Sequence, residues 1–574
     1  MGRRQSAAGK ELAAEKGTWR KKWTGLLPVA LLFPNRYGIG NANLGFQIVY
    51  DLVNSLPGFV CERFFLGPEP PRSLESGRPL RDFPVVLCSL SFEQDFFNLL
   101  SLLSAGGIEP LAEKRSADAP CFRPGQPLII GGGVATFINP EPLSPFIDLF
   151  VIGEAEPVLA QLLEHLAGRL TVQSPTELLT EVAQTFAGCY APRLYAMHYG
   201  GDGVLARIEP AAGVPERIKR LVLAGSPVVG HSKLFSPENE FADMFLAELG
   251  RGCSRGCRFC AAGFVYRPPR LWQADSILAA LDQRPEGITR VGLLGMEMVR
   301  REELDRIAEY LLAQGCALSF SSLRADVVES RLCHLLAASR LKSAAIAPDG
   351  GSQRLRRVIN KGISEEDVLT AAEALARAGI SHLKLYFMIG LPTEKEEDMA
   401  ELLALTEKVR QVLLGVGRSR GRLGNITLSV NSFVPKAWTP FQFHPFAPLA
   451  ELKNRIRLLR KGVAAMANVR MTVDSPHHAL QQAVLARGDR RVGMALYGMH
   501  RHGLTWRQSF QELGITPEAY AMRQRDREEL FPWEVIDHGM DRRYLWLEYE
   551  KALAEKPTAA CETQQCRRCG VCHD

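Results

Sequence analysis

The sequence of 574 residues has no apolar stretch that approaches the length needed to cross a bilayer. It also shows no cleavable export signal, because the basic start Met1–Ser6 is not followed by an apolar region. The formal net charge of +6 is small for this length, so it hints at an anionic partner without establishing one. We therefore predict a cytoplasmic protein with no membrane partner.

Cysteine is distributed unevenly along the chain. Of thirteen cysteines, seven fall in two short clusters, within 253–260 and 561–572. In an extracellular protein this number would suggest disulfides, whereas short clusters suit metal ligation in a reducing compartment better. The sequence thus predicts two metal sites.

The first cluster has the spacing C-x3-C-x2-C and directly follows a predicted strand at 245–249; its members are Cys253, Cys257 and Cys260. An iron–sulfur cube wants four ligands, so three thiolates leave one iron free to hold a small molecule. A structural zinc site would normally take a fourth Cys or His nearby, and residues 261–270 contain neither. The competing interpretations are a zinc knuckle or three buried core thiols.

Residues 252–260 read Gly-Cys-Ser-Arg-Gly-Cys-Arg-Phe-Cys, which resembles the signature of the radical S-adenosylmethionine (SAM) superfamily. The resemblance implies a 4Fe-4S cluster whose open iron is chelated by the amino and carboxylate groups of SAM. One electron then cleaves the sulfonium to give a 5′-deoxyadenosyl radical. Phe259 matches the aromatic position that lies near the adenine in this family.

The amino-terminal half is expected to be an α/β domain. After a polar leader, 1–24, apolar runs alternate with helical stretches through 25–185, with strands predicted at 29–33, 60–65, 85–89, 128–130 and 149–152. This alternation predicts a doubly wound parallel sheet, whose ligands bind beyond the carboxyl ends of the strands. Three loops are therefore candidates for binding: 34–45, 89–92 and 131–136.

The third of these loops carries candidate cofactor-binding residues: Gly131, Gly132, Gly133 and Thr136. It belongs to a stretch that resembles the cobalamin-binding-type domain preceding many radical SAM cores. The D-x-H-x-x-G motif that places a histidine beneath the cobalt is absent. Two interpretations stay open, a cobalamin holder without an axial histidine or a vestigial domain that shapes the substrate cleft. Turns of any α/β domain also use glycine for positive φ.

A connector, 186–240, precedes a second α/β region, 241–440. Six strands are predicted there, at 245–249, 290–294, 317–323, 343–347, 382–389 and 426–433. Six βα units make a partial (β/α)6 TIM-type barrel, the architecture of the radical SAM core. Barrel chemistry sits at the carboxyl ends of the strands, where the triple-cysteine loop falls.

Residues near these strand ends match the family one by one. Ser322 and Arg324 resemble the pair that holds the ribose and carboxylate of SAM, and arginine suits a carboxylate because of its planar fork. Ile389 and Gly390 resemble the strand end that lines the adenine. Gly295 begins Gly-Met-Glu where families often place Gly-Gly-Glu for the amino group of SAM, so this contact is a weaker expectation. Residues 349–361 resemble a segment shared by radical SAM methylthiotransferases.

A helical extension, 441–556, includes a basic group of three side chains, Arg487, Arg490 and Arg491. These side chains suit either a phosphate-bearing substrate or a solvated helix face. The tail, 557–574, carries four further candidate metal ligands, Cys561, Cys566, Cys569 and Cys572, which suit an auxiliary iron–sulfur cluster or a zinc ion.

Together these features predict a radical SAM enzyme. By family analogy, the expected outcome is methyl or methylthio transfer, or another modification, on an unidentified substrate such as RNA or protein. The expected electron donor is a flavodoxin or ferredoxin. The competing hypothesis is a non-catalytic iron–sulfur carrier, which would use all seven clustered cysteines without affinity for SAM.

Overall fold

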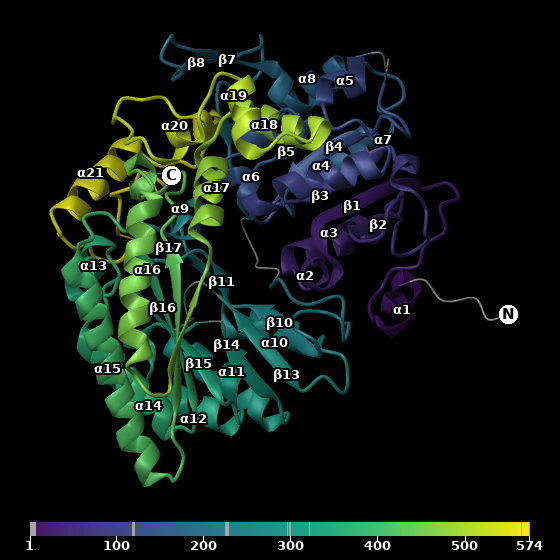
Figure 1. The fold of residues 1–574 in the computed structure, drawn as a ribbon. Coiled ribbons are helices and arrows are strands. Elements are labelled where there is room, and N and C mark those ends of the chain that lie inside the picture. Colours follow the sequence, from purple (N-terminus) through teal and green to yellow (C-terminus); the bar gives the residue numbers. More distant parts are fainter. Residues whose placement is uncertain are drawn as a thin grey trace. The chain divides into compact units, whose positions relative to one another are not determined.

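The computed structural model describes residues 7–117, 121–223, 229–295, 297, 300–320, 322–563 and 565–572. The chain forms two compact units, which are described separately (Figure 1). Unit 1 comprises Met1–Met244, Leu485–Pro517 and Glu528–Gly539. Unit 2 comprises Phe245–Val484, Glu518–Arg527 and Met540–Asp574. Residues of the predicted extension therefore contribute to both units.

Unit 1 is built on a six-stranded sheet with the order β2-β1-β3-β4-β5-β6. Its first five strands run parallel and β6 pairs antiparallel with β5. The strands are β1 (Leu27–Arg36), β2 (Phe59–Leu66), β3 (Val85–Ser89), β4 (Leu128–Gly132), β5 (Leu149–Val151) and β6 (Cys189–Tyr190). Their side chains are buried along most of each strand, as a parallel sheet covered on both faces requires.

Helices cover this doubly wound sheet. They include α2 (Tyr37–Asn41), α3 (Leu44–Ser55), α4 (Phe96–Ala105), α6 (Val134–Ile138), α7 (Leu159–Ala167) and α8 (Pro175–Thr185). The strand order reverses between β1 and β3, so the loops after these two strands flank the topological switch point. Two later helices, α18 (Arg490–His502) and α19 (Trp506–Glu512), complete the unit, and α18 packs against α4 and the short helix η3 (Glu141–Leu143).

Unit 2 contains all six strands predicted for the barrel. They are β10 (Met244–Glu248), β13 (Arg290–Leu294), β14 (Ala317–Phe320), β15 (Ser343–Asp349), β16 (His382–Ile389) and β17 (Asn425–Ser432). Strands β10-β13-β14 form one sheet and β15-β16-β17-β18 another, and a parallel bridge from Leu323 to Ile346 connects them. Strand β18 (Val469–Val473) adds a seventh parallel strand that the sequence pattern did not predict.

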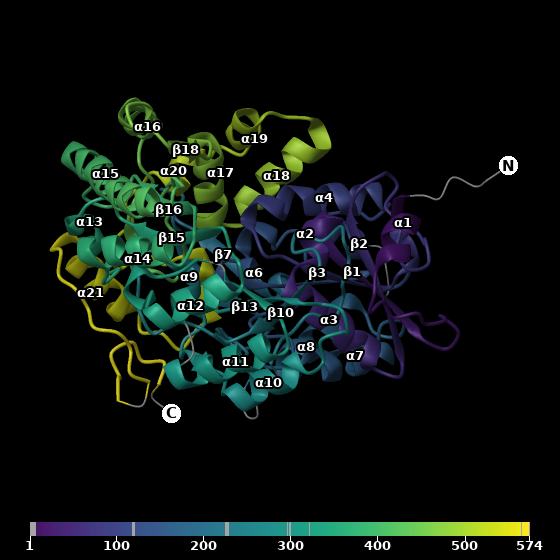
Figure 2. The same ribbon diagram turned by 90° about the horizontal axis from the view of Figure 1, so that it is seen from below.

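The helices of unit 2 follow its strands in βα order. They are α10 (Ala274–Leu281), α11 (Arg301–Ala313), α12 (Ser330–Ala338), α14 (Glu365–Arg377), α15 (Glu396–Ser419) and α16 (Leu449–Ala464). Figure 2 shows α10, α11, α12 and α14 beside the strands that they connect. The predicted fold class, a doubly wound α/β domain followed by a partial TIM-type barrel, is confirmed. Over the described residues, no helix is both long and apolar enough to span a membrane.

Candidate functional site

The triple-cysteine loop follows β10, the first strand of the barrel. Gly252 needs its glycine there, because its φ is +92° and an added Cβ would lie 2.6 Å from the carbonyl oxygen of Tyr266. The Cys260 amide donates to the Cys257 carbonyl over 3.0 Å, and the Gly263 amide donates to the Cys260 carbonyl over 3.0 Å. These bonds wind the loop into the short helix α9 (Ala261–Val265).

The three thiols of this loop are half-buried and close enough to influence one another. Burial raises the pKa of Cys253 to about 11 and that of Cys260 to about 12, and it also raises the pKa of Cys257. The positive charges of Lys361 and Arg324 oppose this rise at Cys257. A bound metal would have to displace the protons of these thiols, since a coordinated thiol loses its proton outright. Three cysteines on one short loop supply the donor set of a three-thiolate iron–sulfur cluster.

Arg324 lies beside the Cys257 thiol. Its guanidinium donates to the Asp326 carboxylate over 3.0 and 3.2 Å and to the Lys361 carbonyl over 2.8 Å. These bonds hold the planar fork next to the loop. Ser322 is exposed at the same strand end. Contact of either side chain with SAM stays a prediction.

Two acidic side chains brace the loop and its surroundings. Glu297 accepts from the Ser254 amide over 2.7 Å and from its hydroxyl over 2.6 Å. Asp349 pairs with Lys361 over 2.5 Å, and the Lys361 ammonium lies 5.9 Å from the Phe259 ring centre. Burial raises the pKa of Asp349, and Lys361 opposes this rise. Glu297 thus positions the cysteine loop. The sequence did not predict this role, because the motif at 295–297 is Gly-Met-Glu and not the Gly-Gly-Glu of the family.

The other predicted SAM-binding positions are used in packing and backbone pairing. An added Cβ on Gly295 would lie 2.8 Å from the Glu297 carbonyl oxygen. Gly390 has a φ of +81° and donates its amide to Glu394 over 2.6 Å. The Ile389 carbonyl accepts the Phe433 amide over 2.8 Å. These contacts account for the residue types, and binding of adenine at this strand end stays a prediction.

The Gly-rich loop of unit 1 is also packed against its own chain. A Cβ on Gly131 would lie 2.8 Å from the Phe150 ring, and one on Gly133, where φ is +106°, would lie 2.5 Å from the Leu90 carbonyl oxygen. Thr136 donates its hydroxyl to the Gly133 carbonyl over 2.8 Å. Within this loop, Gly132 alone faces open space. Close packing thus explains Gly131 and Gly133 but not Gly132.

Later segments of unit 1 pack just beyond this loop. The Asn139 amide donates to the Gly488 carbonyl over 2.9 Å, and His538 donates its Nε2–H to the Phe137 carbonyl over 2.8 Å. Burial lowers the pKa of His538 to about 3, so this imidazole is neutral. The sequence analysis did not single out His538, because it lies far along the chain from the sheet. Binding of cobalamin by this unit stays a prediction, and we derive no step through it.

The three arginines predicted as a phosphate-binding group or a solvated face serve neither purpose. Arg487 is fully buried. Arg490 pairs with Glu141 over 2.8 Å, and Arg491 pairs with Asp489 over 2.6 Å. Arg490 meets Glu141 because α18 packs against η3, and Arg491 pairs with its own neighbour in the chain.

The tail brings its four cysteines into mutual electrostatic range. Cys569 is buried, and Arg568 donates its Nε–H to the Cys566 sulfur over 3.2 Å. A small cavity of about 10 Å³ lies between the tail and the cysteine loop, lined by Ser254, Gly256, Arg267, Asn360, Cys561, Cys566 and Cys569 among others. In the described part of the chain, no three Cys, His, Asp or Glu side chains form a ready site for a single metal ion.

Comparisons with known proteins find matches to two family models. Residues 247–406 match the family model described as the radical SAM superfamily, and residues 45–192 match the model for the amino-terminal region of radical SAM proteins. The uncharacterized protein MJ0966 of Methanocaldococcus jannaschii is 26% identical over 470 residues, which are 82% of this chain and 90% of that protein.

Solved structures with detectable likeness are more distant. The cobalamin-dependent SAM radical enzyme OxsB, with aqua-cobalamin and SAM bound, is 15% identical with a TM-score of 0.45, over 85% of this chain and 70% of that one. In its apo form the match spans only 51% of the OxsB chain. Coproporphyrinogen III oxidase (HemN) of Escherichia coli is 15% identical with a TM-score of 0.28, over 38% and 52% of the two chains. On its cysteine loop and both family models, the chain belongs to the radical SAM superfamily.

Proposed function

We propose that this radical SAM protein binds a 4Fe-4S cluster through Cys253, Cys257 and Cys260 and uses it to cleave SAM reductively. The observation that supports this most directly is a set of three desolvated thiols at a barrel strand end, with Arg324 and Lys361 beside them. When bound, the cluster supplies the electron that converts SAM into methionine and a 5′-deoxyadenosyl radical. The protein binds and orients SAM and shields the reacting groups.

Arg324 is the side chain that we assign to the SAM carboxylate. Its Nε and Nη2 atoms already donate to Asp326 and Lys361, so Nη1 is the atom that would donate a charge-assisted hydrogen bond to the ligand. Phe259 and the end of β16 would hold the adenine. Glu297 and Asn360 keep the loop backbone in place, since both bond to it.

The proposed net reaction is methyl or methylthio transfer to an unidentified substrate, RNA or protein among the candidates. Support comes from the segment 349–361, which resembles that of methylthiotransferases. Two of its residues, Asp349 and Lys361, form an ion pair beside the cluster loop. A flavodoxin or ferredoxin in a reducing, cytoplasmic environment is the proposed electron source.

The rival function, an iron–sulfur carrier without turnover, is favoured by the presence of two cysteine groups. An iron–sulfur carrier would have no need of Arg324, whose guanidinium is held next to the Cys257 thiol. The two functions differ in one property, the affinity of the reduced protein for SAM.

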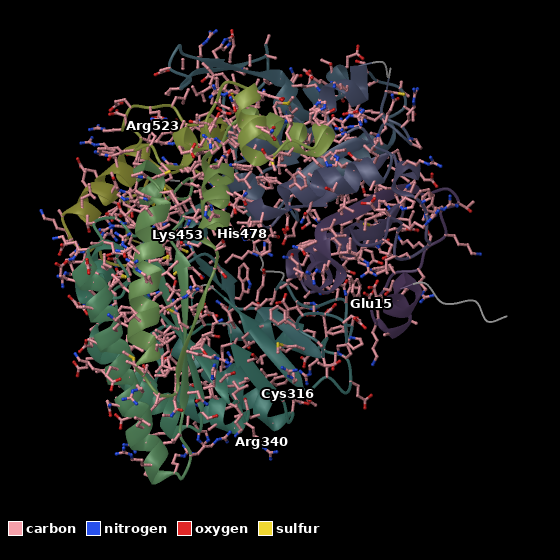
Figure 3. All side chains as sticks on the ribbon, in the orientation of Figure 1. Glu15, Cys316, Arg340, Lys453, His478 and Arg523 are labelled. Carbon is pink, nitrogen blue, oxygen red and sulfur yellow. The ribbon has the colours of Figure 1, made fainter. Side chains whose placement is uncertain are left out.

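Anaerobic reconstitution with iron and sulfide, followed by dithionite and SAM, tests the proposal. We expect 5′-deoxyadenosine and methionine in equal amounts from the native chain and none from Cys257→Ala. Cys316→Ala is the matched control, because this buried thiol, labelled in Figure 3, precedes β14 and belongs to neither cysteine cluster. A fully loaded cluster that binds no SAM and releases no 5′-deoxyadenosine would overturn the proposal.

A further inference from the structure

We propose that the amino-terminal ends of β15, β16, β17 and β18 form a basic surface that binds the phosphate backbone of single-stranded RNA. This surface lies at the opposite end of the strands from the cysteine loop, so it would hold RNA away from the reacting atoms. The inference rests on the proposed function in one respect only, since it selects RNA from the two candidate substrates named there.

Four chain segments make up this surface, and none of them contains an acidic residue. They lead into the four strands in turn and are 339–343, 376–382, 417–425 and 465–470. Together they carry seven exposed arginine and lysine side chains, Arg340, Lys342, Arg377, Arg418, Arg420, Arg422 and Arg470. Seven cations without a carboxylate give a local charge of +7, against +6 for the whole chain. Positive charge is therefore concentrated on this face, as a polyanion requires.

Backbone hydrogen bonds hold the segments side by side. The Ser381 amide donates to the Lys342 carbonyl over 3.0 Å, and the Asn425 amide donates to the Ser381 carbonyl over 2.9 Å. The Ile426 amide donates to the Asn468 carbonyl over 2.9 Å. The four segments therefore form one continuous basic surface.

Most of these charges are not neutralised by carboxylates. Arg377 pairs with Glu373 over 2.7 Å. Four of the others have no side-chain partner among the residues that the structure describes, namely Arg340, Lys342, Arg418 and Arg422. Their charged groups are available to phosphates, because no carboxylate has to be displaced first.

A cavity of about 200 Å³ lies within the basic surface. Lys342, Arg420 and Arg422 are among the residues that line it. Arg420 is held in place, because its guanidinium donates to the Ala376 carbonyl over 2.9 Å at the end of α14. A phosphate group that entered this cavity would meet the two unpartnered cations, Lys342 and Arg422. Arginine suits a phosphate because its planar fork can make two parallel hydrogen bonds.

The segment 415–424 indicates which kind of polyanion the surface binds. It reads Gly-Val-Gly-Arg-Ser-Arg-Gly-Arg-Leu-Gly, so arginine alternates with small residues as in the RGG and RS segments that bind single strands. Guanidinium planes also stack on unpaired bases. The exposed amides of Asn425 and Asn468 belong to the same surface and would bond to 2′-hydroxyl groups, the feature that separates RNA from DNA.

A redox protein such as a flavodoxin suits this surface less well. Strand β16 has eight residues and rises about 26 Å, at about 3.3 Å per residue. A redox centre docked at its amino-terminal end would lie at the far end of the barrel from the cysteine loop. RNA has no such restriction, because a long strand can contact both ends of the barrel.

Fluorescence anisotropy with a fluorescein-labelled single-stranded RNA of mixed sequence tests the proposal on the full chain. The variant Lys342→Ala/Arg418→Ala/Arg422→Ala removes three exposed cations that have no partner to lose. Each phosphate contact on a single strand contributes about 0.7 to the slope of log K against log salt, so this variant should lower the slope by about 2. At about 0.1 M salt this change corresponds to about 100-fold weaker binding.

The matched control, Lys22→Ala/Arg81→Ala/Arg123→Ala, removes three exposed cations from unit 1 and should bind the RNA as the native chain does. Equal affinity of the two triple variants for the RNA would overturn the proposal. Equal or tighter binding of DNA with the same sequence would overturn the choice of RNA. Displacement of the RNA by polyglutamate at equal charge would indicate an acidic protein as the partner and would also overturn it.

Hydrogen exchange of the native chain gives a second readout should the triple variant not fold. Bound RNA should protect the backbone amides of 417–425, and protection confined to other segments would contradict the proposal. Neither measurement needs SAM or a cluster. A chain that binds RNA at this surface but releases no 5′-deoxyadenosine would therefore contradict the proposed function alone.

Discussion

Replacing Arg258 by alanine should loosen the contact between the cysteine loop and the tail. The side chain is fully buried and donates to Glu548 over 3.1 and 3.2 Å and to the Val358 and Lys556 carbonyls over 3.0 and 2.7 Å. Without it, the buried Glu548 carboxylate loses one of its two cationic partners, Lys551 being the other. Removing one member of a buried ion pair costs about 3–5 kcal/mol.

The lower end of this range applies to Arg258. Glu548 keeps two partners, the Lys551 ammonium at 2.8 Å and the Thr558 hydroxyl at 2.8 Å, which compensate part of its charge. We therefore expect the free energy of unfolding of unit 2 to fall by about 3 kcal/mol.

Urea denaturation of the apo chain, followed by tryptophan fluorescence and circular dichroism, measures this change. Arg306→Ala is the matched control, since its pair with Asp275 is exposed and such pairs contribute about 0–1 kcal/mol. We also expect the reconstituted Arg258→Ala chain to lose iron faster than the control. Equal stability of the two variants, with equal iron retention, would refute the role assigned to Arg258.

Three other predictions follow from the same structure. The pKa of His538 is lowered to about 3 in the folded chain, so below pH 6.5 the unfolded chain binds more protons than the folded one. Unit 1 should therefore lose about 2 kcal/mol of stability between pH 7 and pH 5. Denaturation of His538→Gln over the same pH range should show a smaller loss. Gly133→Ala should destabilise unit 1 by about 1–3 kcal/mol because φ is positive and the Leu90 carbonyl blocks the Cβ, whereas Gly132→Ala should be tolerated in the same melts. Arg324→Ala should weaken SAM binding by about 1.5–3 kcal/mol, measured by calorimetry on the protein with its iron–sulfur cluster reconstituted. Equal affinity of the variant and the native chain for SAM would show that Arg324 does not bind this ligand.

The sequence predicted the strands of both sheets well, because buried parallel strands are continuous apolar runs. Val85–Ser89 and His382–Ile389 agree with the structure to the residue. Strand β18 was missed because Val469–Val473 alternates with exposed polar side chains and has no apolar run.

The roles of single residues were harder to predict, since they depend on neighbours far along the chain. A glycine pattern does not tell whether the space beside it belongs to a ligand or to the protein, and Gly133 faces Leu90. The same limit applied to the arginines of α18, whose partner Glu141 lies in the first sheet domain. The cysteine loop could be predicted because its spacing alone indicates a ligand set, and binding of a cluster there stays a prediction.

A labelled-ligand measurement on the reduced protein tests the central claim most directly. The Cys566→Ala/Cys569→Ala chain would be reduced and mixed with SAM carrying ¹³C in its carboxylate or ¹⁵N in its amino group. Electron–nuclear double resonance should then detect coupling of the label to the cluster on Cys253, Cys257 and Cys260. A reduced cluster that shows no coupling to either label would contradict an open iron that chelates SAM.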